Sequence, residues 1–125
     1  MNYRRGGNGP LELLELRQYQ GETYSNPQMN ATMGAGDRVI VHCLVNEASG
    51  TSPTVTVRAE DSSDGENWTE VGSSPVIGSF SVGGQPEMQR GVVEFPHARF
   101  LRFKVEVGGT NPAATLSLRA SIKNA

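Results

Sequence analysis

Apolar and polar residues alternate most clearly between residues 54 and 60. The apolar positions are Val55, Val57 and Ala59, with Thr, Arg and Glu between them. A period of two places apolar side chains on one face of a strand, so the segment is predicted to be a strand with one buried face. The polar run 61–65 (DSSDG) that follows is typical of a tight turn. The pattern therefore predicts a β-hairpin whose second strand opens at Trp68.

Three further segments carry strand patterns. Residues 38–45 (RVIVHCLV) are apolar at odd and even positions alike, which is typical of a central strand covered on both faces. Residues 99–107 alternate, and their apolar positions are Leu101, Phe103, Val105 and Val107. The last strand carries Ala114, Leu116, Leu118, Ala120 and Ile122 on one face and polar or charged side chains on the other.

Shorter patterns fill the rest of the chain. They cover residues 11–20, 29–33, 68–72, 76–82 and 91–95, and the first of them also fits a helical turn. Loops are predicted at 46–53 and 108–112, where Gly, Ser, Asn and Pro gather. About eight short strands with frequent turn signals and no convincing helix predict an all-β fold, an antiparallel β-sandwich or jelly roll.

The beginning of the chain differs from the rest. Residues 1–10 are mainly Gly, Asn and Arg with one Tyr, too poor in apolar side chains to fold alone. We therefore expect an extended N-terminal arm and edge strand over residues 1–36, and a β-sandwich domain over residues 37–125. A free glycine-rich terminus usually frays, so a neighbouring chain is expected to hold the arm.

Two segments of the chain are similar to each other. Residues 50–59 contain GTSP followed by TVTVRA, and residues 109–120 contain GTNP followed by AATLSLRA. Two loops that each use a proline-stiffened turn to feed a strand explain this match more simply than a duplication does.

Composition narrows the range of functions. The 125 residues carry a formal net charge of −2, and the 11 Lys and Arg are scattered, which argues against a nucleic-acid groove. No apolar run is long enough to span a bilayer, and no secretion signal is visible at the start. The single Cys43 lies in an apolar strand, so it is expected to be a buried, inert thiol in a protein made in a reducing cytosol.

Catalytic motifs are missing, and we expect neither an enzyme nor a bound cofactor or metal. His42 and Cys43 are neighbours on a strand, so their side chains should point to opposite faces. His97, in a Pro-His corner, is expected to cap backbone. A weaker alternative places calcium on the acidic turn formed by Glu60, Asp61, Asp64, Glu66 and Asn67. Trp68 is expected to plug the core, with a sugar-binding platform as the alternative.

The turn SSDGENWTEV resembles the S-x-DG-x-x-W turn of discoidin-like sandwiches. Together, NEASGTSPTVTVRAEDSSDGENWTEV and ARFLRFKVEVGGTNPAATLSLRAS resemble small structural proteins of tailed bacteriophages, over residues 38–122. The resemblance implies a virion component at the capsid surface, made in the host cytoplasm, which decorates or cements the shell. A neck or tail protein is the next alternative. A carbohydrate-binding module is a further one, because discoidin-like sandwiches often bind sugars.

In a decoration protein, the arm is the expected contact with the major capsid protein. The residues assigned to this contact are Tyr3, Arg4, Arg5, Leu11, Leu13, Leu14 and Leu16. The arginines would meet carboxylates and the leucines would be buried against the shell. The alternative is that Leu11 to Leu16 complete the sandwich. A homo-oligomer is expected, with a trimer favoured, and neither nucleic acid nor membrane is an expected partner.

Overall fold

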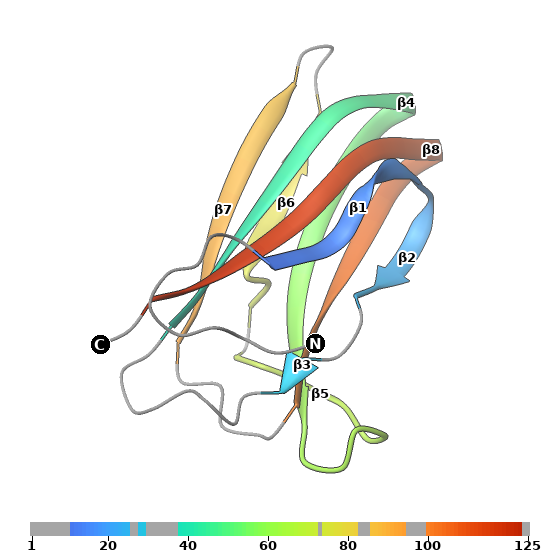
Figure 1. Ribbon diagram of the computed structural model, residues 1–125. Helices are drawn as coiled ribbons and strands as arrows, with labels where there is room; N and C mark the ends of the chain where they lie inside the picture. Colours follow the sequence, from blue (N-terminus) through green and yellow to red (C-terminus); the bar gives the residue numbers. More distant parts are fainter. Residues whose placement is uncertain are drawn as a thin grey trace.

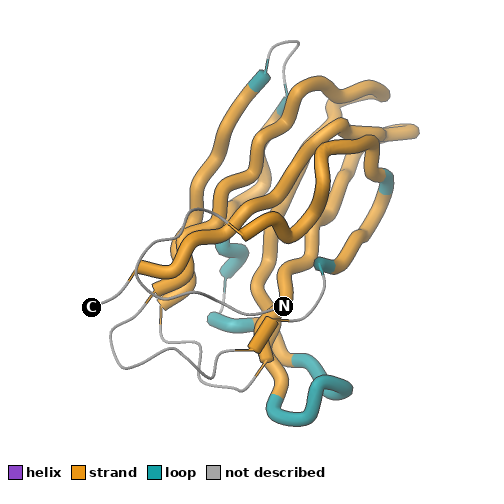
Figure 2. Tube along the Cα trace, viewed as in Figure 1, coloured by secondary structure: helices purple, strands orange, loops and turns teal. Residues whose placement is uncertain are grey.

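The computed structural model describes residues 11–25, 28–29, 38–72, 74–82, 86–94 and 100–123. This part of the chain forms eight strands and contains no helix (Figures 1 and 2). They are β1 (Leu11–Tyr19), β2 (Gly21–Tyr24), β3 (Gln28–Met29), β4 (Arg38–Ser62), β5 (Thr69–Glu70), β6 (Ile77–Ser81), β7 (Glu87–Glu94) and β8 (Phe100–Lys123). All strand pairs are antiparallel, so the predicted all-β antiparallel sandwich is confirmed.

The fold is built on a ribbon of two long strands, β4 and β8. They pair from Arg38 opposite Lys123 to Ser62 opposite Phe100, and the ribbon bends over near its middle (Figure 1). The bend turns one continuous sheet into two facing layers. Layer 1 contains β1, β7, residues 38–47 of β4 and residues 114–123 of β8. Layer 2 contains β2, β3, β5, β6, residues 54–62 of β4 and residues 100–108 of β8.

The bend explains why the two GT[SN]P segments are alike. Thr51 lies opposite Thr110, so the two segments face each other in the same corner. Each has positive φ at its Gly and at the residue before Pro: +99° and +51° at Gly50 and Ser52, and +123° and +49° at Gly109 and Asn111. The prediction of loops at residues 46–53 and 108–112 was wrong, because strands β4 and β8 continue through both segments.

Side chains from both layers meet in a single core. The most deeply buried large residues are Phe103, Leu101, Leu116, Leu118, Val39, Val41, Val45, Val55, Val57, Val105 and Cys43. The predicted inward faces of residues 55–59, 101–107 and 114–120 are therefore confirmed. The side chain of Ile122 lies outside the described part of the structure.

The prediction that residues 38–45 are covered on both faces was wrong. Val39, Val41, Cys43 and Val45 are fully buried, but Ile40, His42 and Leu44 on the opposite face are only half-buried. The apolar residues at both parities therefore mark an outer face of layer 1 that is partly open.

Before residue 36 the described part of the chain contributes three paired strands. β1 pairs with residues 114–120 of β8, β2 pairs with residues 104–107, and β3 pairs with residues 100–101. Ser25 fastens the end of β2, because its backbone N–H donates to the Phe103 carbonyl and its hydroxyl accepts from the Phe103 N–H, both at 2.9 Å. The division of the chain at residue 36 stays a prediction, and residues 1–10 lie outside the described residues.

Candidate functional site

The outer face of layer 2 carries two aromatic rings with an arginine between them. The Arg102 Cζ lies 4.2 Å from the ring centroid of Tyr24 and 4.2 Å from that of Trp68. The same guanidinium donates from Nε to the Glu60 carboxylate at 2.8 Å. Rings and guanidinium at this distance attract through the ring quadrupole. We call these three residues, Tyr24, Arg102 and Trp68, the Arg102 stack.

The expectation that Trp68 plugs the core was wrong. The indole is half-buried and is not part of the hydrophobic core; it packs against Arg102 on the outside of the sheet. The reason is its position: Trp68 follows the turn that leads out of β4, and β8 presents the outward-facing Arg102 beside it. Tyr24, at 42% exposure, completes a surface where two aromatic rings remain accessible.

Charged side chains continue this face in matched pairs. The Arg58 Nε donates to Glu106 at 2.8 Å, and its Nη1 donates to Glu70 at 3.0 Å. The bond from Arg58 lowers the pKa of Glu106, and the same bond raises the pKa of Arg58. The Lys104 ammonium lies 3.5 Å from Glu106. The outer face of layer 2 is therefore an ordered, ion-paired surface with an aromatic cluster at its end.

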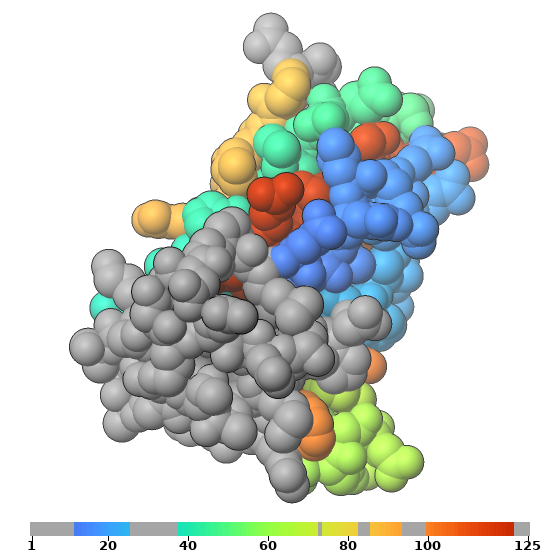
Figure 3. Space-filling view, viewed as in Figure 1, coloured from blue at the N-terminus to red at the C-terminus, as the bar shows by residue number. Residues whose placement is uncertain are grey.

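The acidic turn at 62–67 is held by hydrogen bonds within the chain. The Asp64 Oδ1 accepts from the backbone N–H groups of Glu66 and Asn67, both at 2.8 Å, and from the Ser62 hydroxyl. The Asn67 Nδ2 donates to Oδ2 at 2.7 Å. These bonds, led by that from the Asn67 N–H, hold the pKa of Asp64 below its usual range. Its role is structural, in a turn that projects at the lower right in Figure 3.

No group of three or more His, Cys, Asp and Glu side chains that can hold a metal occurs among the described residues. The calcium alternative therefore receives no support from the geometry of the turn. His42 and Cys43 face opposite sides of β4, as predicted, and burial raises the pKa of Cys43 to about 12. The buried thiol is inert. His97 lies outside the described residues.

The residues assigned to partner contact fall into four groups. Tyr3, Arg4 and Arg5 lie outside the described residues, and for Leu11 only the backbone is described, opposite Ala120. Leu13 and Leu14 are buried inside this chain, whereas Leu16 is 50% exposed. The contact assignment stays a prediction, but of the three leucines whose side chains are described, Leu16 is the one that the structure leaves open to a partner.

Sequence reasoning missed the outer face of layer 1. Pairing places Ile40 beside Val92 and Leu44 beside Met88, with His42 between them beside Arg90 on β7 and Arg119 on β8. Met88 is 55% exposed and Val92 is 42% exposed. Arg90 and Arg119 are exposed, and neither forms an ion pair within the described part of the chain. We call these residues the layer 1 face: Ile40, His42, Leu44, Met88, Arg90, Val92 and Arg119.

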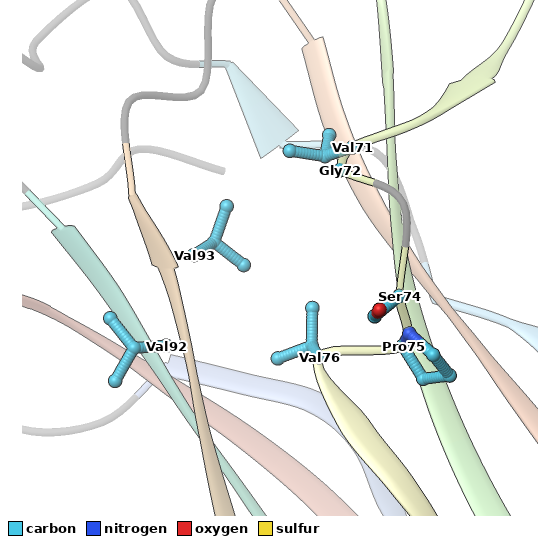
Figure 4. A pocket seen from close by; sticks show the side chains of 7 residues that line it. All are labelled: Val71, Gly72, Ser74, Pro75, Val76, Val92 and Val93. Atoms are coloured by element: carbon cyan, nitrogen blue, oxygen red, sulfur yellow. The ribbon is translucent and has the colours of Figure 1, made fainter.

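A pocket of about 290 Å³ opens between β7 and the segment that leads into β6 (Figure 4). Its lining residues are Val71, Gly72, Ser74, Pro75, Val76, Val92 and Val93. Most of these side chains are aliphatic, but more of the pocket surface is polar than apolar, and none of the lining residues has a titratable side chain.

Comparison with known proteins supports the fold. The chain is similar to the solved structure of the CBM22-1 xylan-binding domain from Paenibacillus barcinonensis Xyn10C, with a TM-score of 0.58 and 13% sequence identity. The match covers 100% of this chain and 90% of that domain. No protein-family model matches the sequence, and no curated protein does. The described residues include no helix that is long and apolar enough to cross a membrane.

Proposed function

We propose that this chain is a non-catalytic structural protein of a tailed-bacteriophage virion, made in the host cytoplasm, that decorates or cements the capsid. The layer 1 face is the observation that carries the proposal. It joins exposed apolar side chains to two arginines without carboxylate partners among the described residues, a composition suited to docking on another protein. The resemblance to phage structural proteins spans residues 38–122, which include all of β4 and β8 up to Ile122. A position at the neck or tail is the alternative within this function.

Docking would combine the body of the sandwich with the N-terminal arm. The sandwich would bind the major capsid protein through the layer 1 face, where Arg90 and Arg119 meet carboxylates of the shell. An arm tethered to a docked body binds its own groove at high effective concentration, so two modest contacts give firm attachment. Repetition over the shell then stabilises the whole particle.

The test is co-sedimentation of the purified chain with shells of the major capsid protein of the same phage, assembled without it. We expect saturable binding, and Arg119→Glu should weaken it at least tenfold because an acidic side chain would oppose the shell carboxylates. Glu66→Gln, on the projecting turn away from this face, is the matched control and should bind normally. Absence of saturable binding by the folded wild-type chain would refute capsid decoration.

The Arg102 stack favours a second function, carbohydrate binding. Accessible aromatic rings beside charged side chains provide the stacking and hydrogen-bonding groups that sugars need. The xylan-binding domain to which the chain is structurally similar shows that the fold is used for this purpose in at least one other protein. Here Arg102 occupies the space between the rings, so a sugar would rest on their outer surfaces.

Titration with soluble xylan, followed through the fluorescence of Trp68, tests this function. Trp68 is the single tryptophan of the chain and reports directly on the stack. Carbohydrate binding predicts a saturable change that Tyr24→Ala removes. Tyr19→Phe should retain the change, because Tyr19 is buried in the core. An unchanged spectrum at high xylan concentration would remove xylan as the ligand.

A further inference from the structure

Among the described residues, strand β7 is a regular edge of layer 1 that pairs with β4 on one side alone. It pairs with β4 over eight consecutive positions, from Glu94 opposite Arg38 to Glu87 opposite Val45, with no register shift. No other described strand pairs with it, and it borders its layer in Figure 1. The opposite edge strand, β1, has two register shifts in its pairing. Such irregularities protect an edge from further pairing, and β7 has none.

The side chains of β7 do little to prevent its edge from pairing with another strand. Met88 and Val92 are exposed on its outer face, and the strand contains no proline or lysine. Arg90 is its single central charge and has no ion-pair partner within the described residues. A flat edge of this kind presents a row of unpaired backbone N–H and C=O groups to another strand.

We propose that β7 pairs with β7 of a second copy of this chain, antiparallel, about a two-fold axis at Val92. The pairing would join layer 1 of the two copies edge to edge into one continuous sheet. This inference concerns self-association and does not depend on the function proposed above.

Charge selects the register. In a continuous antiparallel sheet, opposite residues lie on the same face, so Arg90 must face an even-numbered position of the second copy. An axis at residue 90 would place the two arginines opposite each other. An axis at residue 92 places Val92 opposite Val92 and Arg90 opposite position 94, a glutamate in the sequence. The two Arg90 positions would then be about 13 Å apart along the strands, beyond the Debye length of about 8 Å at physiological salt.

Packing on the inner side agrees with this register. Gly91 is buried, and an added Cβ would lie 2.4 Å from the Val76 side chain, so this segment of β7 is already fitted closely against its own chain. In the dimer, Gly91 of each copy lies opposite Val93 of the other copy. Because glycine has no side chain, the two residues of each pair do not crowd each other. The pocket that Val92 and Val93 line would lie beside the axis in both copies.

Sedimentation equilibrium of the full chain from about 1 μM to 1 mM tests the proposal, since this range covers weak association. We expect a reversible change from 13.4 kDa to twice that mass. Arg90→Glu alone and Glu94→Arg alone each place like charges opposite each other twice, so each should weaken the dimer at least tenfold. The double variant exchanges the charges and should restore it.

Arg119→Glu is the matched control, because Arg119 lies on the same face but on central strand β8. It should leave the dimer unchanged while weakening the proposed shell binding, so failures of the two proposals are distinguishable. Circular dichroism of each variant confirms folding. A monomer throughout, a trimer, or a dimer that is insensitive to both single charge changes would overturn the proposal.

Discussion

At the residue scale, the main departure from expectation is Trp68. A lone tryptophan after a turn is usually buried, and the sequence holds no signal that this one packs on Arg102, 34 positions away. Periodicity shows that Arg102 faces outward from its strand, but it does not show which turn lies beside it. Local chemistry was more informative at Asp64, where the SSDG sequence predicted a turn and the structure shows the bonds that form it.

Replacing Arg102 with methionine should destabilise the protein by about 1–2 kcal/mol. The change removes two ring contacts, each worth about 0.5–1 kcal/mol at an exposed site, and leaves Glu60 without this partner. Urea unfolding measures the loss, and Trp68 fluorescence should shift to longer wavelength in the native state. Arg17→Met, at an exposed arginine 5.3 Å from the Tyr19 ring, should cost clearly less. Equal losses for the two variants would contradict the role given to Arg102.

The pH dependence of stability should report on Asp64. Its pKa in the folded chain is below the value of about 3.9 expected when unfolded, so the folded state favours the charged carboxylate. Its contribution is therefore complete above about pH 4 and is lost as the pH falls towards the folded pKa. Melting temperatures between pH 5 and 2 should decline less steeply in Asp64→Asn than in the wild type. Ser63→Ala, in the same turn, should keep the wild-type slope.

At the element scale, alternation predicted which residues form strands better than where strands end. The inward faces of residues 55–59 and 101–107 follow directly from a period of two. The continuity of β4 and β8 does not, because Gly50, Ser52 and Pro53 are ordinary loop residues and the strand ladder across the bend depends on a segment 59 positions away. The similarity of the two GT[SN]P segments was the available indication of paired bends, since two strands that bend in the same way need similar residues at the bend.

Gly50→Ala should be strongly destabilising. Gly50 has a φ of +99°, and an added Cβ would lie 2.6 Å from the Asn111 carbonyl oxygen and 2.7 Å from that of Thr110. Backbone strain of this kind costs about 1–3 kcal/mol, to which the contact adds. Gly78→Ala is the matched control, because Gly78 has no positive φ and nothing lies within 4 Å of an added Cβ. Thermal unfolding should separate the two variants, and similar melting temperatures would contradict the tight corner.

At the scale of the whole molecule, the fold class was predictable and the two outer faces were not. Strand count and turn chemistry are sufficient to indicate a sandwich. The layer 1 face arises from residues on three strands that pairing brings into rows, and the Arg102 stack joins β2, β8 and the turn after β4. Both depend on register between distant segments, which alternation within one segment does not specify.

The position of β1 determines how much of the N-terminal arm can be deleted without loss of the core. Deleting residues 1–16 would remove Leu13 and Leu14 from the core, with an expected cost of several kcal/mol. Deleting residues 1–10 stops before β1 and should change the free energy of unfolding by less than about 0.5 kcal/mol. If the arm contributes to docking, this shorter deletion should weaken co-sedimentation with shells while urea unfolding stays normal. Unchanged binding would restrict docking to the body of the sandwich.

Quantitative mass spectrometry of purified phage particles tests the central claim most directly, by counting copies of this chain against the major capsid protein in the same sample. Capsid decoration predicts copy numbers comparable with that of the shell protein. A handful of copies per particle would move the chain to the neck or tail. Its absence from intact particles would contradict a virion role and leave carbohydrate binding as the function to pursue.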